Sequence, residues 1–192
     1  MLFRSAYWDK EHFHLPNHPV VGVSWKDAYT YMKWAEKRLP TEAEWEKAAR
    51  GGHEIPDWQQ PGKRVPLVKN PFPQRKYVWG NSFEPNRSNS SDKTFDSFAH
   101  TAPVGQFPEG VSPYGCMDMA GNAKEWCADR YSENYYALKI KENPLGPDDE
   151  RHKNRSCRGG SWKTVIHHLL TYRRWSYPPT ETYEDVGFRL AK

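Results

Sequence analysis

The sequence predicts one domain of the α+β class, with little regular secondary structure and a core rich in aromatic rings. Its 192 residues fit a single domain, so residues 1–192 are treated as one unit. Aromatic residues make up 15% of the chain, whereas the mean hydropathy is only −0.99. Large rings must then supply much of the buried area. Two helix signals and several short strand-like segments occur in the same chain, as in a domain of the α+β class.

An apolar run and two helix signals lie in the first third of the chain. The run PVVGVSW at 19–25 is typical of a buried strand. Ser24 with Asp27, and Thr41 with Glu44, have the spacing of capping boxes. Apolar residues at helical spacing follow each pair, and a Gly-Gly stop follows the second helix. We therefore predict two capped helices, each with one buried face.

The rest of the chain is predicted to be irregular. Residues 53–76 are rich in Pro, Gln and basic residues without periodicity, so we expect an exposed insertion loop there. Farther on, Gly, Pro, Asn and Ser break the chain into short segments. Strand-like pieces occur at SCRGGSW, residues 156–162, and at VGFRLA, residues 186–191.

Composition argues against several classes of function. The net charge of +4 comes from interspersed charges and is too small for a nucleic-acid surface. No apolar run approaches the ~18 residues of a membrane span, and the first residues lack the apolar segment of a secretory signal. The three cysteines, at 116, 127 and 157, cannot all pair and show no C-x-x-C spacing, so neither a disulfide framework nor a zinc site is predicted. The compartment stays open.

The stretch DMAGNAKEW, residues 118–126, is a candidate calcium loop. It carries the carboxylates of Asp118 and Glu125, with mostly small residues between them. Calcium takes six to eight oxygens, and a short loop can supply them by combining carboxylates with backbone carbonyls. A simpler interpretation is that Asp118 caps a turn and Glu125 forms a surface ion pair.

Several segments, taken in order, resemble the formylglycine-generating enzyme family, also called the sulfatase-modifying factor domain. The resemblance extends from about His18 to the end of the chain. It implies that family's irregular variant of the C-type lectin fold, with two bound calcium ions. The strand region with which the family usually begins is expected to be missing, and a partner chain or larger assembly could supply it. The matching segments are HPVVGVSWKDAYTYMKWAEKRLPTEAEWEKAARGG, YVWGN, TAPVGQFP, YGCMDMAGNAKEW, RGGSW and GFRLA.

The resemblance also implies the ligands of both calcium ions. The first site corresponds to Asp118, Gly121, Ala123 and Glu125, with carbonyl oxygens from the glycine and the alanine. The second site resembles SNSSDKTFDSF, residues 88–98, and corresponds to Asn89, Ser90, Asp96 and Phe98. One or two ions are expected, in a structural role that closes otherwise weakly ordered loops.

The family's oxidation of a substrate cysteine to formylglycine relies on two cysteines that bind copper(I) shortly after the Gly-Gly-Ser. Here the corresponding positions are Thr164 and Leu169, and no cysteine follows Cys157. A hydroxyl and an isobutyl group cannot replace two soft anionic ligands. We therefore expect no catalytic residues, and the preferred function is a calcium-stabilised binding or structural module.

The enzymatic alternative is a metal-dependent oxidase, or a component of an iron-dependent sulfoxide synthase. The histidines of HFHLPNH, at positions 12, 14 and 18, could chelate a transition metal if the segment curled, although packing of the loop is the preferred role. His167 and His168 lie where the family's active-site wall would be. On a strand, only one of the two could face a pocket.

As a binding module, the chain would use loops to contact an unidentified protein or small molecule. Residues 163–172 and 176–185 occupy positions that vary in related variable proteins of diversity-generating retroelements. Their neighbourhood is rich in amphipathic rings of the kind found at binding surfaces, although core packing is preferred for Trp175. These rings are Tyr172, Trp175, Tyr177 and Tyr183. Hydrogen bonds to carbonyls are expected from Arg173, Arg174 and Arg189.

Overall fold

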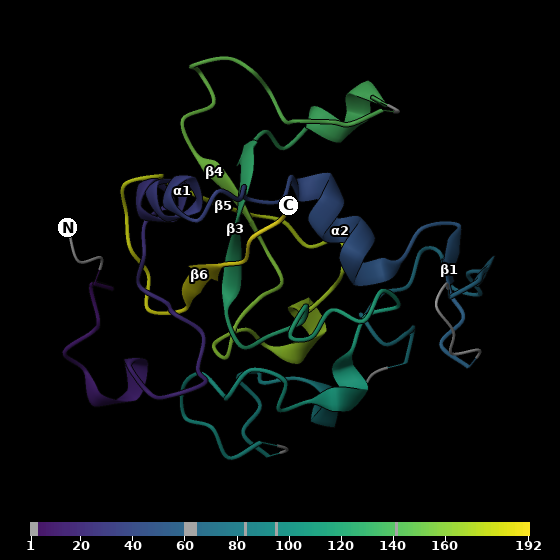
Figure 1. Cartoon of the computed structure of the whole chain (residues 1–192), viewed down its shortest axis with the longest axis horizontal. Coiled ribbons are helices and arrows are strands. Elements are labelled where there is room, and N and C mark those ends of the chain that lie inside the picture. Colours follow the sequence, from purple (N-terminus) through teal and green to yellow (C-terminus); the bar gives the residue numbers. More distant parts are fainter. Residues whose placement is uncertain (1–3, 60–64, 83, 95, 141) are drawn as a thin grey trace.

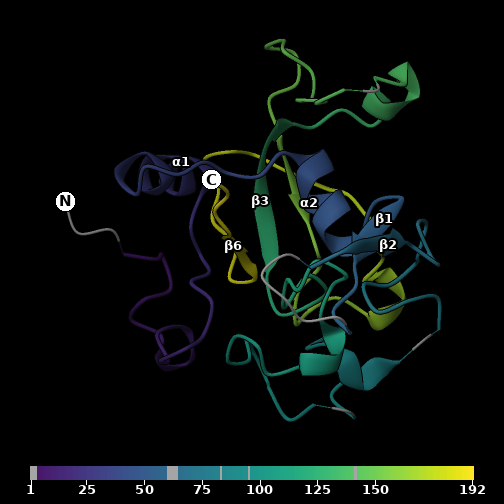
Figure 2. The same cartoon turned by 45° about the vertical axis from the view of Figure 1, so that its right-hand side comes forward.

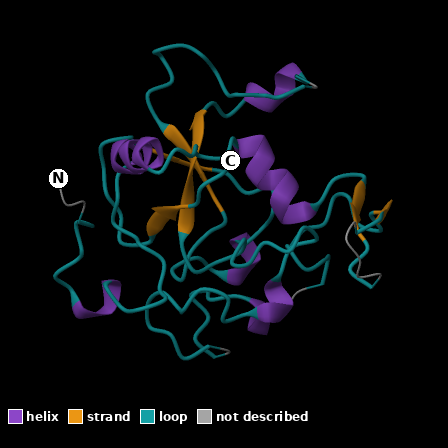
Figure 3. Ribbon diagram, in the orientation of Figure 1, coloured by secondary structure: helices purple, strands orange, loops and turns teal. Residues whose placement is uncertain are grey.

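A computed structural model describes residues 4–59, 65–82, 84–94, 96–140 and 142–192. Loops make up most of the chain, and a small sheet lies at the centre with a helix on either side (Figures 1 and 3). This arrangement confirms the predicted irregular α+β class. None of the described helices is long and apolar enough to cross a membrane.

The two helices begin where the capping boxes predicted. Helix α1 (Trp25–Trp34) has Ser24 as its N-cap, and α2 (Glu42–Arg50) has Thr41. In both helices the cap side chain accepts a hydrogen bond from the third helical residue, whose carboxylate in turn accepts one from the N-cap backbone. Gly51, with φ of +80°, ends α2 in a conformation that favours glycine.

The central sheet has the strand order β5-β4-β3-β6. Its strands are β3 (Lys124–Arg130), β4 (Arg155–Arg158), β5 (Trp175–Tyr177) and β6 (Val186–Phe188). Strand β4 pairs antiparallel with β3 and β5, whereas β6 runs parallel to β3. Figure 2 shows β3 standing between α1 and α2.

Neighbouring residues of β3 point into two different cores. Trp126 packs in a cluster with Ala28 and Met32 of α1, and Cys127 packs in a cluster with Trp45 of α2. Successive side chains of a strand face opposite sides of the sheet, so β3 is buried on both faces. The sequence did not predict β3, because charged residues occupy four of its seven positions.

Five short 3-10 turns and a small second sheet complete the described elements. The turns are η1 (Glu11–Phe13), η2 (Pro85–Arg87), η3 (Pro108–Gly110), η4 (Tyr135–Leu138) and η5 (Ile166–His168). The second sheet pairs β1 (Glu54–Pro56) antiparallel with β2 (Leu67–Lys69). It lies within residues 53–76, which were predicted to be a loop without strands, and residues 60–64 of that segment lie outside the described residues.

Segment 53–76 is exposed along β2 but is anchored at its C-terminal end. Asn70 is buried, and its side-chain oxygen accepts hydrogen bonds from Arg75 at 2.8 Å and from the Phe72 N–H at 3.0 Å. Its side-chain amide donates to the Gly52 carbonyl at 2.8 Å. A hairpin and an anchored end therefore replace the featureless loop that composition suggested.

The predicted strand at 19–25 was wrong. Val21 and Val23 are buried as expected, but no strand includes these residues and Trp25 already belongs to α1. Gly22 interrupts the run with φ of +72°, and a Cβ there would lie 2.2 Å from the Tyr7 ring. Hydrophobicity correctly predicted that this segment is buried. The positive φ of Gly22 interrupts the extended backbone that a β-strand needs.

A buried ionic network joins α2 to the sheet. The Glu42 side chain is 1% exposed. Its carboxylate accepts hydrogen bonds from Arg174 at 2.6 and 2.9 Å and from the Ser156 hydroxyl at 2.9 Å. Arg158 lies 3.5 Å from the same carboxylate. Asp129 accepts the Glu42 backbone N–H at 2.7 Å, and burial raises the pKa of Asp129 to about 6.

Candidate functional site

The predicted calcium loop curls immediately before β3. Asp118, Gly121 and Asn122 have φ of +57°, +77° and +62°. At Gly121 the chain passes so close to a neighbouring loop that a Cβ would lie 2.1 Å from the Asn89 carbonyl oxygen. Only glycine avoids that collision, so the small residue at this position has a structural cause.

Asn122 holds the loop in place, a role that the sequence analysis missed. Its side chain accepts the Ala102 N–H at 2.8 Å and donates to the Ala102 carbonyl at 3.1 Å. Its backbone N–H donates to the Asn89 carbonyl at 2.9 Å. The signal was available, because asparagine tolerates the left-handed conformation better than most residues do.

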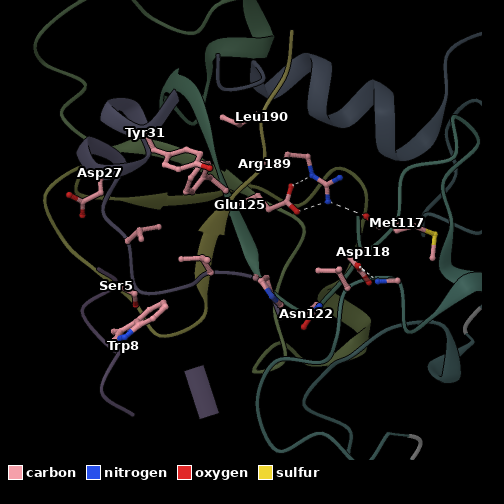
Figure 4. A pocket seen from close by; sticks show the side chains of 17 residues that line it. Ser5, Trp8, Asp27, Tyr31, Met117, Asp118, Asn122, Glu125, Arg189 and Leu190 are labelled. Carbon is pink, nitrogen blue, oxygen red and sulfur yellow. Dashed lines mark hydrogen bonds and ion pairs between the residues drawn. The ribbon is translucent and has the colours of Figure 1, made fainter. Parts of the chain in front are cut away.

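Glu125, which is buried, forms an ion pair with the partly exposed Arg189 (Figure 4). Its two carboxylate oxygens accept Arg189 hydrogen bonds at 2.5 and 2.6 Å, and one of them also accepts the Trp45 indole N–H at 2.6 Å. Arg189 donates in addition to the Met117 carbonyl at 3.1 Å. The ion pair considered for Glu125 therefore exists, but it is partly buried and does not lie on the surface.

Asp118 lies on the same side of the loop, near Arg189 (Figure 4). One of its carboxylate oxygens accepts the Gly105 N–H at 2.7 Å. Burial raises the pKa of Asp118, and the Glu125 carboxylate adds to this rise, whereas the Gly105 N–H and Arg189 oppose it. The Glu125 carboxylate thus disfavours the charged form of Asp118, and a cation bound by both would relieve this repulsion.

The first site has donors that fit calcium. Gly121 and Ala123 are buried, and among the hydrogen bonds of the described residues none ends on their carbonyl oxygens. A carbonyl oxygen without a donor within the chain is free to bind water or a cation. Carbonyl and carboxylate oxygens are the donors that calcium prefers. Asp118, Gly121, Ala123 and Glu125 would hold such an ion, although Arg189 already binds both oxygens of the Glu125 carboxylate.

The residues of the second predicted site surround a lysine. Lys93 Nζ lies 3.0 Å from Asn89 Oδ1, 2.5 Å from the Ser90 carbonyl oxygen and 3.3 Å from Asp96 Oδ1. Phe98 contributes its backbone N–H to Asp96 Oδ1 at 3.1 Å. Three of the four predicted ligand residues therefore direct oxygens at one point, and the ammonium group of Lys93 occupies it.

The two positions that the resemblance matched to cysteines, Thr164 and Leu169, lie together beside Gly160. Thr164 and Leu169 are buried, and a Cβ at Gly160 would lie 2.4 Å from Leu169 Cδ2 and 3.3 Å from Thr164 Cγ2. The Thr164 hydroxyl accepts the Ser161 N–H at 3.0 Å. The methyl groups and the hydroxyl offer no soft ligand at this position.

All three cysteines are free thiols, and two of them are fully buried. Burial raises the pKa of Cys127 and of Cys157 well above the usual value. A thiol becomes nucleophilic or metal-binding when it ionises, so these two behave as apolar core residues. Cys116 is partly exposed.

The N-terminal histidines have separate partners. His12 stacks on His100 with ring centroids 4.3 Å apart, His14 Nδ1 lies 3.1 Å from the Lys10 carbonyl oxygen, and His18 Nδ1 lies 3.0 Å from Thr101 Oγ1. Within the described ranges, no three His, Cys, Asp or Glu side chains gather as they would around a metal ion.

His167 and His168 belong to the 3-10 turn η5 and not to a strand. The prediction that they face opposite sides of a strand was therefore wrong. Both side chains are exposed.

Of the aromatic side chains considered for a binding surface, one is exposed and three are partly buried. Tyr172 is exposed, whereas Trp175, Tyr177 and Tyr183 are partly buried against the cluster that contains Trp126. Arg174 and Arg189 bind carbonyls as predicted, but both also bind carboxylates, on Glu42 and Glu125. Arg173 lies over the Trp175 ring at 5.2 Å from its centroid. The sequence could not reveal the acidic partners, because they lie far away along the chain.

A pocket of about 790 Å³ opens beside the first site (Figure 4). Its lining is mostly apolar, with Tyr31, Phe188 and Leu190 among the larger side chains. Asp118 and Glu125 belong to the same lining. The conformation of the candidate calcium loop therefore sets the shape of part of the pocket wall.

Fold and site together define an irregular α+β domain in which loops carry oxygen-rich clusters around a small central sheet. Residues 4–192 match the family model described as a sulfatase-modifying factor enzyme 1-like domain. The chain therefore belongs to the sulfatase-modifying factor, or formylglycine-generating enzyme, family.

Named relatives include proteins described as active and as inactive. A formylglycine-generating enzyme of Thermomonospora curvata is 39% identical over 92% of this chain and 56% of its own length. An inactive C-alpha-formylglycine-generating enzyme 2 of Bos taurus is 33% identical over 90% of this chain and 50% of its own length. The chain thus spans about half the length of these relatives. Among solved structures, PvdO from Pseudomonas aeruginosa has a TM-score of 0.66 at 26% identity, covering 92% of this chain and 62% of PvdO.

Proposed function

We propose that this chain is a non-catalytic member of its family, a binding or structural module stabilised by calcium at residues 118–125. The observation that carries this proposal is the replacement of the two family thiols by Thr164 and Leu169, which pack beside Gly160. Neither side chain offers a thiolate or another soft ligand for copper(I). The Bos taurus relative described as inactive supports the idea that this fold serves without catalysis.

Calcium would support binding through the shape of the pocket. The loop that carries Asp118 and Glu125 forms part of the pocket wall, and the carbonyls of its residues Gly121 and Ala123 have no donor among the described residues. An ion held there would fix the loop and the wall together. The ligand is an unidentified protein or small molecule, contacted by a mostly apolar surface with charged groups at its edge.

A second candidate is a metal-dependent oxidase or a component of a sulfoxide-synthase-type enzyme. The 39% identity to a formylglycine-generating enzyme favours it. It requires that a metal be held by residues other than the two substituted positions.

The purified chain should form no aldehyde on a cysteine-containing sulfatase peptide in the presence of copper(I) and oxygen. Mass spectrometry of the peptide and capture by a hydrazide probe would measure the product, with the Thermomonospora curvata enzyme as a positive control. Aldehyde formation by the unmodified chain would overturn the non-catalytic proposal.

The double variant Thr164→Cys/Leu169→Cys sharpens this test. Its thiols would occupy adjacent buried positions, so we expect tighter copper(I) binding than in the unmodified chain. The matched control is Val165→Cys/Leu170→Cys, which has the same spacing in sequence but shifts both thiols by one residue. Equal copper affinity in the two double variants would show that positions 164 and 169 do not form a paired site.

Removal of calcium should lower the melting temperature of the unmodified chain. A single site saturated at about 100 times its Kd stabilises a protein by about 2.7 kcal/mol, which corresponds to about 5–10 °C in a domain of this size. Asp118→Ala should remove most of the response, because it deletes a carboxylate ligand. Scanning calorimetry with excess calcium or with EGTA measures both effects.

Asp148→Ala is the matched control for this experiment, because it removes an exposed carboxylate far from the loop in sequence. It should retain the full response to EGTA. An unchanged melting temperature of the unmodified chain with and without EGTA would remove calcium from the proposed function.

A further inference from the structure

In the segment 88–98, of which residue 95 lies outside the described residues, three oxygens surround an ammonium group. We infer that Lys93 supplies, from within the chain, the cation that a second calcium ion would otherwise provide. The inference builds on the proposed calcium-stabilised module, and it limits the bound ions to one. It concerns a loop different from residues 118–125.

The geometry matches the hydrogen-bonding capacity of an ammonium group. Lys93 Nζ faces three oxygens, at 3.0 Å on Asn89, 2.5 Å on the Ser90 carbonyl and 3.3 Å on Asp96. An ammonium group has three N–H donors and no acceptor, so three oxygens saturate it. One of these oxygens belongs to a carboxylate that is only 2% exposed, and a cation beside it offsets part of the cost of burying that charge.

The same loop is closed by hydrogen bonds to the buried carboxylate. Asp96 accepts the Phe98 N–H at 3.1 Å and the Ser90 N–H at 3.4 Å, while the Ser90 hydroxyl accepts the Asp92 N–H at 3.2 Å. These contacts direct oxygens inward from both ends of the segment. Such an arrangement suits a central cation, and Lys93 lies midway between the residues that provide the oxygens.

Calcium and the Lys93 ammonium cannot share this position. Calcium needs six to eight oxygens at 2.3–2.6 Å, and a positive charge at the same oxygens would repel it. The lysine side chain is 36% exposed, so the alternative is that it swings into solvent when calcium arrives. The number of ions bound by matched variants separates these two arrangements.

An internal cation would also change how the first site is supported. Asn89, which Lys93 binds through its side-chain oxygen, donates to the His100 carbonyl at 2.8 Å and accepts the Asn122 N–H at 2.9 Å on its own carbonyl. Lys93 thereby fixes the residue against which residues 118–125 pack. The support requires no calcium, so it persists when calcium is scarce.

The test is the number of calcium ions bound per chain, measured by equilibrium dialysis and by calorimetric titration. Lys93→Ala should bind one more calcium ion than the unmodified chain, because it frees the three oxygens. Lys163→Ala is the matched control, since it removes another ammonium group that pairs with a carboxylate, that of Glu184, and it should leave the number unchanged. Lys93→Gln retains side-chain length without the charge, and it should also gain an ion if Lys93→Ala does not fold.

The outcomes separate this inference from the proposed function. If the unmodified chain binds no calcium and Lys93→Ala binds one ion, the first site fails and the Lys93 inference stands. If the unmodified chain binds one ion and both Lys93 variants also bind one, the inference is overturned while the first site stands. Two ions in the unmodified chain would likewise overturn it, because the lysine would then yield its position to calcium.

Discussion

Glu42→Ala is expected to lower the free energy of unfolding by about 3–5 kcal/mol, the usual result of breaking a buried ion pair from one side. The Glu42 carboxylate is 1% exposed and is held at 2.6 and 2.9 Å by Arg174. Its removal leaves Arg174 and the fully buried Arg158 near a vacated position and deprives Ser156 of its acceptor. Urea denaturation followed by tryptophan fluorescence measures the loss.

Glu109→Ala is the control for that variant. Glu109 is 70% exposed and lies 3.8 Å from Arg87, so its removal should change stability by no more than about 1 kcal/mol. Glu42→Gln should rank between the two, because the amide can still accept one hydrogen bond but carries no charge. A loss below about 1 kcal/mol in Glu42→Ala would show that the network contributes little to stability.

Local signals predicted the helices well. A capping box acts within four residues, so Ser24 and Thr41 fixed the beginnings of α1 and α2 without any tertiary contact. Strand β3 is the opposite case. Lys124 pairs with Asp185, 61 residues away, and Glu125 pairs with Arg189, 64 residues away. Without these partners the strand has the composition of an exposed loop, and no local pattern could correct that impression.

In the candidate site too, features set by neighbouring residues were predictable from sequence, whereas contacts with residues far away along the chain were not. The composition of residues 118–126 predicted a curled loop, and the positive φ values at Gly121 and Asn122 agree with the curl, whereas the predicted ligand oxygens stay a prediction. Arg189, which shares the Glu125 carboxylate, could not be assigned from sequence. Lys93 could have been considered, because it lies inside the very segment that was predicted to bind a cation. The resemblance predicted the oxygens that surround a cation, but it did not predict that the cation is the ammonium group of Lys93.

Glu125→Ala should have an effect similar in size to that of Glu42→Ala, about 3–5 kcal/mol. The change leaves Arg189 without its carboxylate partner and the buried Trp45 indole N–H without its acceptor. It should also abolish the response of the melting temperature to EGTA, because the calcium loop loses a ligand. Urea denaturation in calcium and in EGTA measures both consequences.

Arg189→Gln separates the two roles of that carboxylate. In the present structure two of the hydrogen bonds to Glu125 come from Arg189, so the guanidinium competes with an ion for the same oxygens. Removal of the positive charge should therefore strengthen calcium binding while it weakens the calcium-free domain. The EGTA-induced fall in melting temperature should then be larger in Arg189→Gln than in the unmodified chain. An equal or smaller fall would mean that Glu125 serves Arg189 alone, and calcium at residues 118–125 would have to be held without it.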